Sequence, residues 1–145
     1  MVAIYSSYAN RKRYSLLITD KDEISRETMK ELFEPEGYNT YLAGSGREAI
    51  EIAREVLIHA LITDMNLPDI SGLDTFGFIK KEFQVVLPCI LLSRNASKET
   101  LLRAISAEAY TVISKPINLD ALHFAMKQIM KKYYRGNEGF DEIYI

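Results

Sequence analysis

Four residues whose side chains could handle phosphate chemistry each stand at the end of a short apolar run. They are Asp20, Asp64, Ser93 and Lys115. Carboxylates supply the hard oxygen ligands that Mg²⁺ prefers, and a free carboxylate can attack phosphorus. A hydroxyl and an ammonium group can satisfy the oxygens of a transferred phosphoryl group. Brought together, these four side chains would form a site that accepts and holds a phosphoryl group.

The positions of these residues depend on the elements that precede them. Five short apolar runs are typical of β-strands, and each is followed by a longer stretch in which apolar residues recur at helical spacing. The runs cover residues 16–19, 40–43, 60–63, 88–93 and 111–114, and the helical stretches cover residues 21–36, 47–56, 72–83, 98–107 and 119–132. Strands that are apolar throughout are typical of a parallel sheet with helices on both faces. The sequence therefore predicts an α/β fold with five strands and five helices.

This fold would place the four polar side chains at one edge of the sheet. The carboxyl ends of parallel strands lie together, and ligand sites of such sheets form beside them. Asp20 follows the first strand, Asp64 the third, and Ser93 and Lys115 the fourth and fifth. A single acidic residue at a strand end is often only a helix cap, so the prediction of a site depends on the combination.

Two of the predicted helices have residues that mark a buried face or an end. In the first helix we expect one buried face formed by Ile24, Met29, Leu32 and Phe33, and we expect Gly37 to end it in a left-handed conformation. Ser45 is a suitable cap for the second helix. The last helix carries an apolar stripe of Ala121, Leu122, Ala125, Met126, Ile129 and Met130.

The composition is that of one globular domain. The chain has 145 residues, of which 48% are apolar and 26% charged, and its net charge is −2. These values exclude a disordered chain and a membrane span, and they give no broad positive field for binding nucleic acid or an acidic membrane. The single cysteine, Cys89, excludes a disulfide framework, and residues 1–13 lack the pattern of a secretory signal. We therefore expect a cytoplasmic protein.

Several motifs, in order along the chain, resemble the receiver domain of response regulators, the CheY-like module of two-component signalling. The longest is residues 61–72, and shorter ones are residues 37–38, 44–49, 91–93 and 114–116. The resemblance covers residues 14–132. It leaves residues 1–13 as an N-terminal extension and residues 133–145 as a C-terminal tail or the start of a linker.

The resemblance implies a fold and a role for each site residue. The fold would be a flavodoxin-like, doubly wound, three-layer structure whose parallel strands have the order 2-1-3-4-5. Asp64 would be the phosphoacceptor, Ser93 the hydroxyl that turns toward the phosphoryl group, and Lys115 the partner of the aspartyl phosphate. Asp20, Asp64 and the backbone carbonyl of Asn66 would bind Mg²⁺.

The resemblance also implies partners. The phosphoryl group would come from a histidine kinase or a phosphotransfer protein. An output protein or domain would bind the face formed by the fourth helix, the fifth strand and the fifth helix, and the domain could form a homodimer. We expect no membrane contact, no direct binding of nucleic acid and no enzymatic activity on a separate substrate.

The first strand departs from the family, in which two adjacent acids usually follow it. Alignment by Arg26 places Asp20 on the first acid and Lys21 on the second, which is normally the direct metal ligand. A protonated lysine cannot ligate Mg²⁺, so the Lys21 ammonium could take the place of the cation. Alternatively, Lys21 points to solvent and Asp22, or a shifted register, restores a ligand. The sequence leaves both interpretations open, and with them the binding of Mg²⁺.

Three further departures affect the expected switch. Val112 stands where the family usually has an aromatic residue, and Tyr110 is expected on the same strand face about 7 Å away. Glu108 replaces a usual glycine. Arg94 replaces the usual small residue after the fourth strand, where it could narrow the entry of the phosphodonor, bind an anion, or be only an exposed loop arginine.

Two alternatives to a phosphoacceptor domain follow from these departures. The first is a pseudo-receiver that binds partners without phosphorylation, which Lys21 and Val112 favour. The second is a phosphatase of the haloacid dehalogenase type, because residues 20–22 resemble the Asp-x-Asp signature of that family. Against it, no adequate acidic pair follows Lys115, and the chain has no cap domain.

Overall fold

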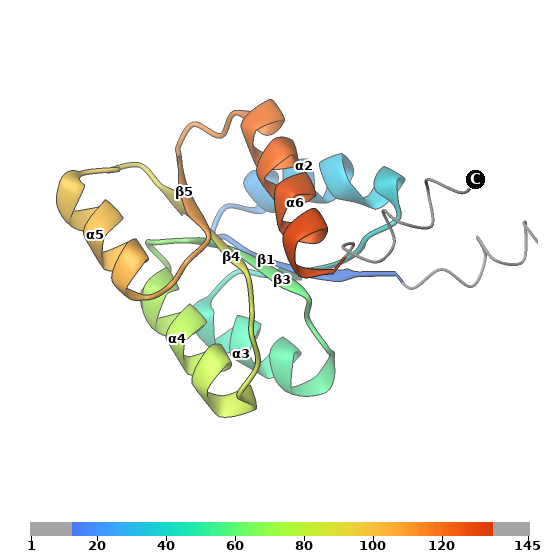
Figure 1. The fold of residues 1–145 in the computed structure, drawn as a ribbon, viewed down its shortest axis with the longest axis horizontal. Coiled ribbons are helices and arrows are strands. Elements are labelled where there is room, and N and C mark those ends of the chain that lie inside the picture. The colour runs from blue at the N-terminus through green and yellow to red at the C-terminus, as the bar shows by residue number, and fades with distance from the viewer. Residues whose placement is uncertain (1–12, 135–145) are drawn as a thin grey trace, which may run out of the picture.

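Strands and helices alternate along the part of the chain that the computed structural model describes, residues 13–134 (Figure 1). The strands are β1 Ser15–Thr19, β2 Asn39–Ala43, β3 Ala60–Asp64, β4 Cys89–Ser93 and β5 Thr111–Ser114. The helices are α2 Glu23–Phe33, α3 Gly46–Glu55, α4 Gly72–Phe83, α5 Lys98–Ser106 and α6 Leu119–Tyr133, and a short 3₁₀ helix spans Glu34–Glu36. The predicted five strands and five helices are confirmed within these residues.

The five strands form one parallel sheet in the order β2-β1-β3-β4-β5, which confirms the order that the resemblance implied. Thr19 of β1 pairs with Thr63 of β3, so the next residues, Asp20 and Asp64, end neighbouring strands side by side. Ser93 of β4 pairs with Ser114 of β5. The register therefore brings the carboxyl ends of β1, β3, β4 and β5 to one edge, as the sequence predicts.

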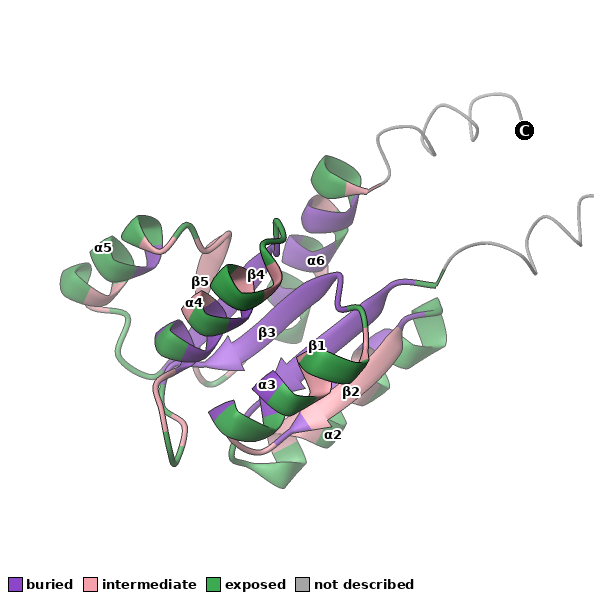
Figure 2. Ribbon diagram, turned by 90° about the horizontal axis from the view of Figure 1, so that it is seen from below, coloured by how far each residue is buried: buried purple, intermediate pink, exposed green. Residues whose placement is uncertain are grey.

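Each face of the sheet carries its own layer of helices. Helices α2 and α6 cover one face, and α3, α4 and α5 lie on the other (Figure 1). Successive strand residues point to opposite faces, so Leu16 packs in the α2/α6 core and Leu17 in the α3/α4/α5 core. Strands β1, β3 and β4 are buried along their length, whereas the outer strands β2 and β5 are mostly half-buried (Figure 2). The burial of both faces explains the continuous apolar runs.

Every described helix longer than one turn has a polar N-cap. The cap side chain accepts a backbone N–H from the first turn, which satisfies a donor that the helix itself leaves free. The caps are Asp22, Ser45, Ser71, Ser97 and Asn118. The prediction for Ser45 is confirmed. These caps fix where each helix begins after the strand and loop that precede it.

The first helix differs from its prediction at both ends. Ile24 is 76% exposed, so its placement on the buried face is wrong. It lies in the first turn of α2 and borders a cavity beside the site, whereas Met29 and Phe33 are buried further along the helix. The helix ends at Phe33, before Pro35, whose ring cannot continue it. Gly37 has φ +97°, which confirms its predicted left-handed conformation.

Two smaller expectations about side chains are also wrong. Ala121 is exposed, while the other five residues of its predicted stripe on α6 are buried. Tyr110 packs on the α2/α6 core and Val112 on the α3/α4/α5 core, so they do not share a strand face. Tyr110 precedes β5 and follows the left-handed residue Glu108 (φ 64°), so the two-residue alternation of the strand does not extend back to it.

Residues 1–12 and 135–145 lie outside the described part of the chain. The proposed N-terminal extension, residues 1–13, and the proposed tail, residues 133–145, therefore fall almost entirely outside it. Helix α6 continues to Tyr133, one residue past the predicted boundary. Between residues 13 and 134, no helix has the length and apolar character needed to cross a membrane.

Candidate functional site

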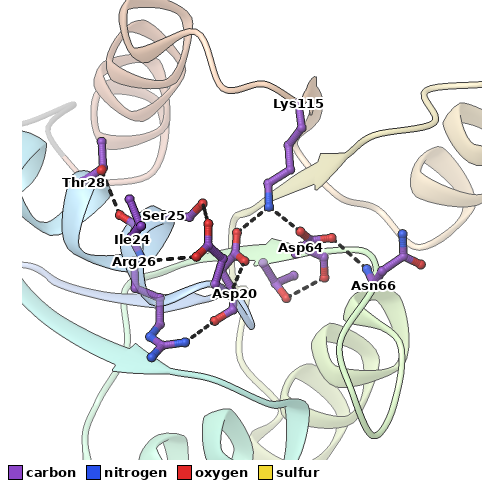
Figure 3. Close-up of polar contacts among 10 residues, drawn as sticks. Asp20, Ile24, Ser25, Arg26, Thr28, Asp64, Asn66 and Lys115 are labelled. Atoms are coloured by element: carbon purple, nitrogen blue, oxygen red, sulfur yellow. Dashed lines mark hydrogen bonds and ion pairs between the residues drawn. The ribbon is translucent and has the colours of Figure 1, made fainter.

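A buried lysine joins two buried carboxylates at the carboxyl edge of the sheet. The Lys115 Nζ lies 2.6 Å from Oδ2 of Asp20 and 2.5 Å from Oδ2 of Asp64 (Figure 3). The side chain of Lys115 is 5% exposed, that of Asp20 is 0% exposed and that of Asp64 is 5% exposed. The three residues come from the ends of β5, β1 and β3, so the sheet topology alone brings them together.

The second oxygen of each carboxylate is held by the backbone. The Asp22 N–H donates to Oδ1 of Asp20 at 2.9 Å, and the Asn66 N–H donates to Oδ1 of Asp64 at 2.8 Å (Figure 3). The Arg26 guanidinium donates to the backbone carbonyl of Asp20 at 2.7 Å. Both carboxylates are therefore fixed in orientation before any ligand arrives. In the sequence, Arg26 served only to align the first strand with the family. Its hydrogen bond to the carbonyl of Asp20 was not predicted.

The charge of Lys115 is stabilised by its two partners. Burial by itself disfavours the ammonium form, but the hydrogen bonds and negative charges of Asp20 and Asp64 outweigh it and raise the pKa of Lys115 above its ordinary value of 10.5. Lys115 therefore stays protonated at neutral pH. It can donate to a new oxygen placed beside Asp64 without first gaining a proton.

Ser93 lies at the same edge but has local partners. Its hydroxyl donates to the carbonyl of Asn95 at 3.0 Å and accepts the Asn95 N–H at 3.1 Å. Ser93 is buried at the end of β4, the strand next to β3. The structure thus brings Asp20, Asp64 and Lys115 into direct contact and places Ser93 on the neighbouring strand, with its hydroxyl directed to its own loop.

Two residues that the sequence reasoning missed shape the loop after Asp64. A Cβ built on Gly72 would lie 2.1 Å from the carbonyl oxygen of Asp64, and the Gly72 N–H donates to the carbonyl of Met65. Asp69 accepts the backbone N–H groups of Gly46 and Arg47 at 2.9 and 2.8 Å. In the sequence, only the position of the glycine after Asp64 could have indicated that Gly72 approaches the carbonyl oxygen of Asp64 closely. Nothing in the local sequence indicates the contact between Asp69 and α3.

The structure bears on both interpretations of Lys21. Lys21 is exposed, and the ammonium group between the carboxylates belongs to Lys115. Asp22 does not restore a metal ligand, because its carboxylate caps α2 and accepts from the Ile24 N–H and the Ser25 hydroxyl. The pKa of Asp22 is lowered, chiefly by the Ser25 hydrogen bond. The Asp22 carboxylate is thus engaged at the start of α2, whereas the Lys115 ammonium joins Asp20 to Asp64.

These contacts also test the expected Mg²⁺ site. No group of three His, Cys, Asp or Glu side chains among residues 13–134 could hold a metal ion. The oxygens that Asp20 and Asp64 turn toward each other both bind the Lys115 ammonium, and the exposed Lys21 stands where the third carboxylate is expected. As arranged, the side chains suit an ammonium group and do not fit a divalent cation.

Known proteins with similar sequences are response regulators. Residues 16–127 match the family model described as the response regulator receiver domain. A putative response regulator NtrX-like from Rickettsia typhi is 33% identical over 128 residues, which is 87% of this chain and 27% of that protein. The polar-differentiation response regulator DivK of Brucella ovis is 33% identical over 108 residues, 72% of this chain and 86% of DivK. The chain thus spans about a quarter of the NtrX-like protein and most of DivK.

Solved structures give the same fold. The chemotaxis protein CheY4 of Vibrio cholerae superposes with a TM-score of 0.77 at 22% identity, over 81% of this chain and 99% of that one. A putative response regulator from Chloroflexus aurantiacus has a TM-score of 0.75 at 28% identity, over 82% of this chain and 98% of that one. The likenesses show the fold, and the match of the family model over residues 16–127 shows that this chain belongs to the response regulator receiver domain family.

Proposed function

We propose that this chain is a phosphoacceptor in two-component signalling, in which Asp64 receives a phosphoryl group from a histidine kinase or a phosphotransfer protein. The observation that carries the proposal is the contact of the Lys115 ammonium with both Asp20 and Asp64 at the carboxyl edge of the sheet. It provides a nucleophilic carboxylate and a fixed cation beside it, which phosphoryl transfer requires.

The family gives this proposal its general frame. Receiver domains are signalling modules rather than enzymes with substrates of their own, and they interact with histidine kinases and output domains. Phosphorylation-based switching is the general role of the family. Receiver domains also generally bind Mg²⁺ at the acidic pocket, but binding of Mg²⁺ by Asp20, Asp64 and the Asn66 carbonyl is not part of this proposal, because the donor set does not fit. A cytoplasmic location is part of it.

The proposed transfer is a simple displacement. A carboxylate oxygen of Asp64 forms a bond to phosphorus, while the bond between phosphorus and the donor's histidine nitrogen breaks and the nitrogen keeps the electron pair. Lys115 already contacts Oδ2 of Asp64 and can donate to a phosphoryl oxygen placed there. The Ser93 hydroxyl would exchange its bond with Asn95 for a second phosphoryl oxygen.

The switch would follow from the change in charge. An aspartyl phosphate carries about two negative charges where the carboxylate carried one, and it adds acceptor oxygens. Movement of Ser93 toward it would pull on the loop that leads from β4 into α5. The proposed output surface is the face of α5, β5 and α6, and exposed apolar side chains of these two helices include Ile105 and Phe124. An output protein, or a second copy of the domain, would bind there.

The proposal is tested by intact-mass spectrometry after incubation with acetyl phosphate, with and without Mg²⁺. The wild type should gain one phosphoryl adduct, and Asp64→Ala should gain none. Asp74→Ala, which removes an exposed carboxylate from α4, should gain the adduct as the wild type does. An equal adduct on Asp64→Ala, or none on the wild type with acetyl phosphate or a phosphohistidine donor, would overturn the proposal.

Two observations favour a second function, the pseudo-receiver that binds partners without phosphorylation. Lys115 already neutralises one of the two carboxylate charges in the unphosphorylated site, and the half-buried Val112 replaces the expected switch aromatic. Such a module would bind its partner equally well as the wild type and as Asp64→Ala. Loss of partner binding in a folded Asp64→Ala variant would exclude it.

A further inference from the structure

The charge of the proposed phosphorylated site is not balanced by the residues already described. This inference rests on the proposed function. With about two negative charges on the phosphoryl group, one on Asp20 and one positive charge on Lys115, about two negative charges remain. A divalent cation would balance them, but the donor set of Asp20 and Asp64 does not fit one. Basic side chains are the other source of positive charge that the domain itself offers.

Two exposed basic residues directly follow site residues at this edge and have no charged partner among residues 13–134. Arg94 directly follows Ser93, and Lys21 directly follows Asp20. Other basic residues of that range, such as Arg54 and Lys80, are paired with carboxylates far from the site. Arg94 and Lys21 are therefore free to bind an anion.

The surface around Arg94 connects it with the site. A cavity of about 260 Å³ has both Arg94 and Lys115 in its wall. The hydroxyls of Ser25 and Thr28 and the apolar side chain of Ile24 also line it. A phosphoryl group bound to the Lys115 ammonium would thus lie close to a cavity whose wall carries the Arg94 guanidinium. Guanidinium groups bind phosphate oxygens in pairs, which a single ammonium cannot do.

We infer that this domain holds its phosphoryl group with side-chain cations, Lys115 together with Arg94 and Lys21, in place of a bound divalent cation. Lys115 is the fixed inner cation, because both carboxylates hold it. Arg94 binds the outward phosphoryl oxygens from the cavity. Lys21 adds charge from the position where the family usually has its metal-binding acid.

The first arm of the test measures cation binding without any phosphorylation. Amide NMR spectra of the ¹⁵N-labelled chain are recorded as MgCl₂ is added up to millimolar concentrations. The wild type should show no saturable shift at Asp20, Asp64 or Asn66, and Lys21→Asp should show one, because it restores the third carboxylate. Saturable shifts in the wild type at these residues would overturn the inference.

The second arm measures the rate of adduct formation with acetyl phosphate in the presence of EDTA. The wild type should react equally fast with EDTA and with Mg²⁺, and Arg94→Ala and Lys21→Ala should each be slower by about tenfold. Arg103→Ala, an exposed arginine on α5, should stay within about twofold of the wild type. Arg94→Lys should recover part of the rate, because it keeps the charge but not the paired geometry.

The two arms separate this inference from the proposed function. If the adduct forms on the wild type only with Mg²⁺, the proposed role of Asp64 as phosphoacceptor stands. The inference that side-chain cations replace the divalent cation is then overturned. An adduct formed with EDTA at the same rate in Arg94→Ala and Lys21→Ala also overturns it. No adduct on the wild type from any donor overturns the proposed function, and with it this inference.

Discussion

At the scale of single residues, the site depends on one buried amine. Removing one partner of a buried ion pair typically costs 3–5 kcal/mol, because the remaining charge is left uncompensated. Here two carboxylates would face each other without Lys115. We predict that Lys115→Met lowers the free energy of unfolding by about 3 kcal/mol at pH 7, measured by urea denaturation. A loss below about 1 kcal/mol would contradict the buried triad.

The pH dependence of that difference follows from the raised pKa of Lys115. The stability that the charged lysine contributes is complete below its unfolded pKa, near 10.5, and is lost as the pH rises through the higher folded value. The gap in unfolding free energy between the wild type and Lys115→Met should therefore be constant from neutral pH to about pH 10 and shrink above it. A gap that shrinks already between pH 7 and 9 would assign the effect to another group.

Gly72 shows a second requirement at the residue scale. Its missing Cβ leaves room for the carbonyl oxygen of Asp64, which a methyl group would meet at 2.1 Å. Gly72→Ala should destabilise the domain by about 1–3 kcal/mol, since the loop after β3 must move. It should also slow phosphorylation, because the Asp64 carboxylate moves with that loop.

Gly77 is the matched control for Gly72, because it lies in the same helix α4 and an added Cβ would meet nothing within 4 Å. Gly77→Ala should leave phosphorylation unchanged and stabilise the domain by up to about 1 kcal/mol, since alanine favours a helix interior. Equal effects of the two substitutions would show that the close approach at Gly72 has no role in positioning Asp64.

At the scale of elements, Asp69 ties the loop between β3 and α4 to the start of α3. Its carboxylate accepts two backbone N–H groups there, and the pKa of Asp69 is lowered to about 2, chiefly by the bond from Arg47. Its contribution to stability is thus present above its ordinary pKa of 3.8 and is lost as the pH falls through about 2.

Substitution of Asp69 tests this connection. Asp69→Ala should lower the melting temperature at pH 7, and its difference from the wild type should vanish as the pH approaches 2, followed by circular dichroism. Glu51→Ala removes an exposed carboxylate from the same helix α3 and should change the melting temperature little. If both variants lose the same amount at both pH values, the loop is not held through Asp69.

The sequence predicted the strands and helices well wherever a single local pattern determines the structure. Apolar runs predicted the five strands, and Gly37 predicted the left-handed end after the first helix. The failures lie where tertiary structure overrides the local pattern. Ile24 fits a helical face by spacing, but its turn borders the cavity beside the site. Tyr110 has the right parity for the face of Val112, but the turn at Glu108 ends the alternation before β5 begins.

At the scale of the whole molecule, the candidate site could be predicted because sheet topology determines it. The parallel strands place Asp20, Asp64 and Lys115 at one edge of the sheet, independently of the conformation of the loops. The charge pattern inside the site could not be predicted. Which ammonium lies between the carboxylates depends on side-chain geometry. The sequence left open whether Lys21 lies there or points to solvent, and the structure has Lys115 there. The contact of Asp69 with α3 links residues far apart in the chain, so no local motif indicates it.

The proposed function of the whole molecule depends on which of the two neighbouring carboxylates, Asp20 or Asp64, accepts the phosphoryl group. Asp20 and Asp64 have similar burial and share Lys115, so the amount of adduct alone does not distinguish them. Borohydride reduces an acyl phosphate to an alcohol, which converts the reacted aspartate to homoserine, and tandem mass spectrometry of the peptides then locates it. We predict homoserine at position 64 and aspartate at position 20. Homoserine at position 20, or at no position after incubation with a phosphodonor, would contradict it.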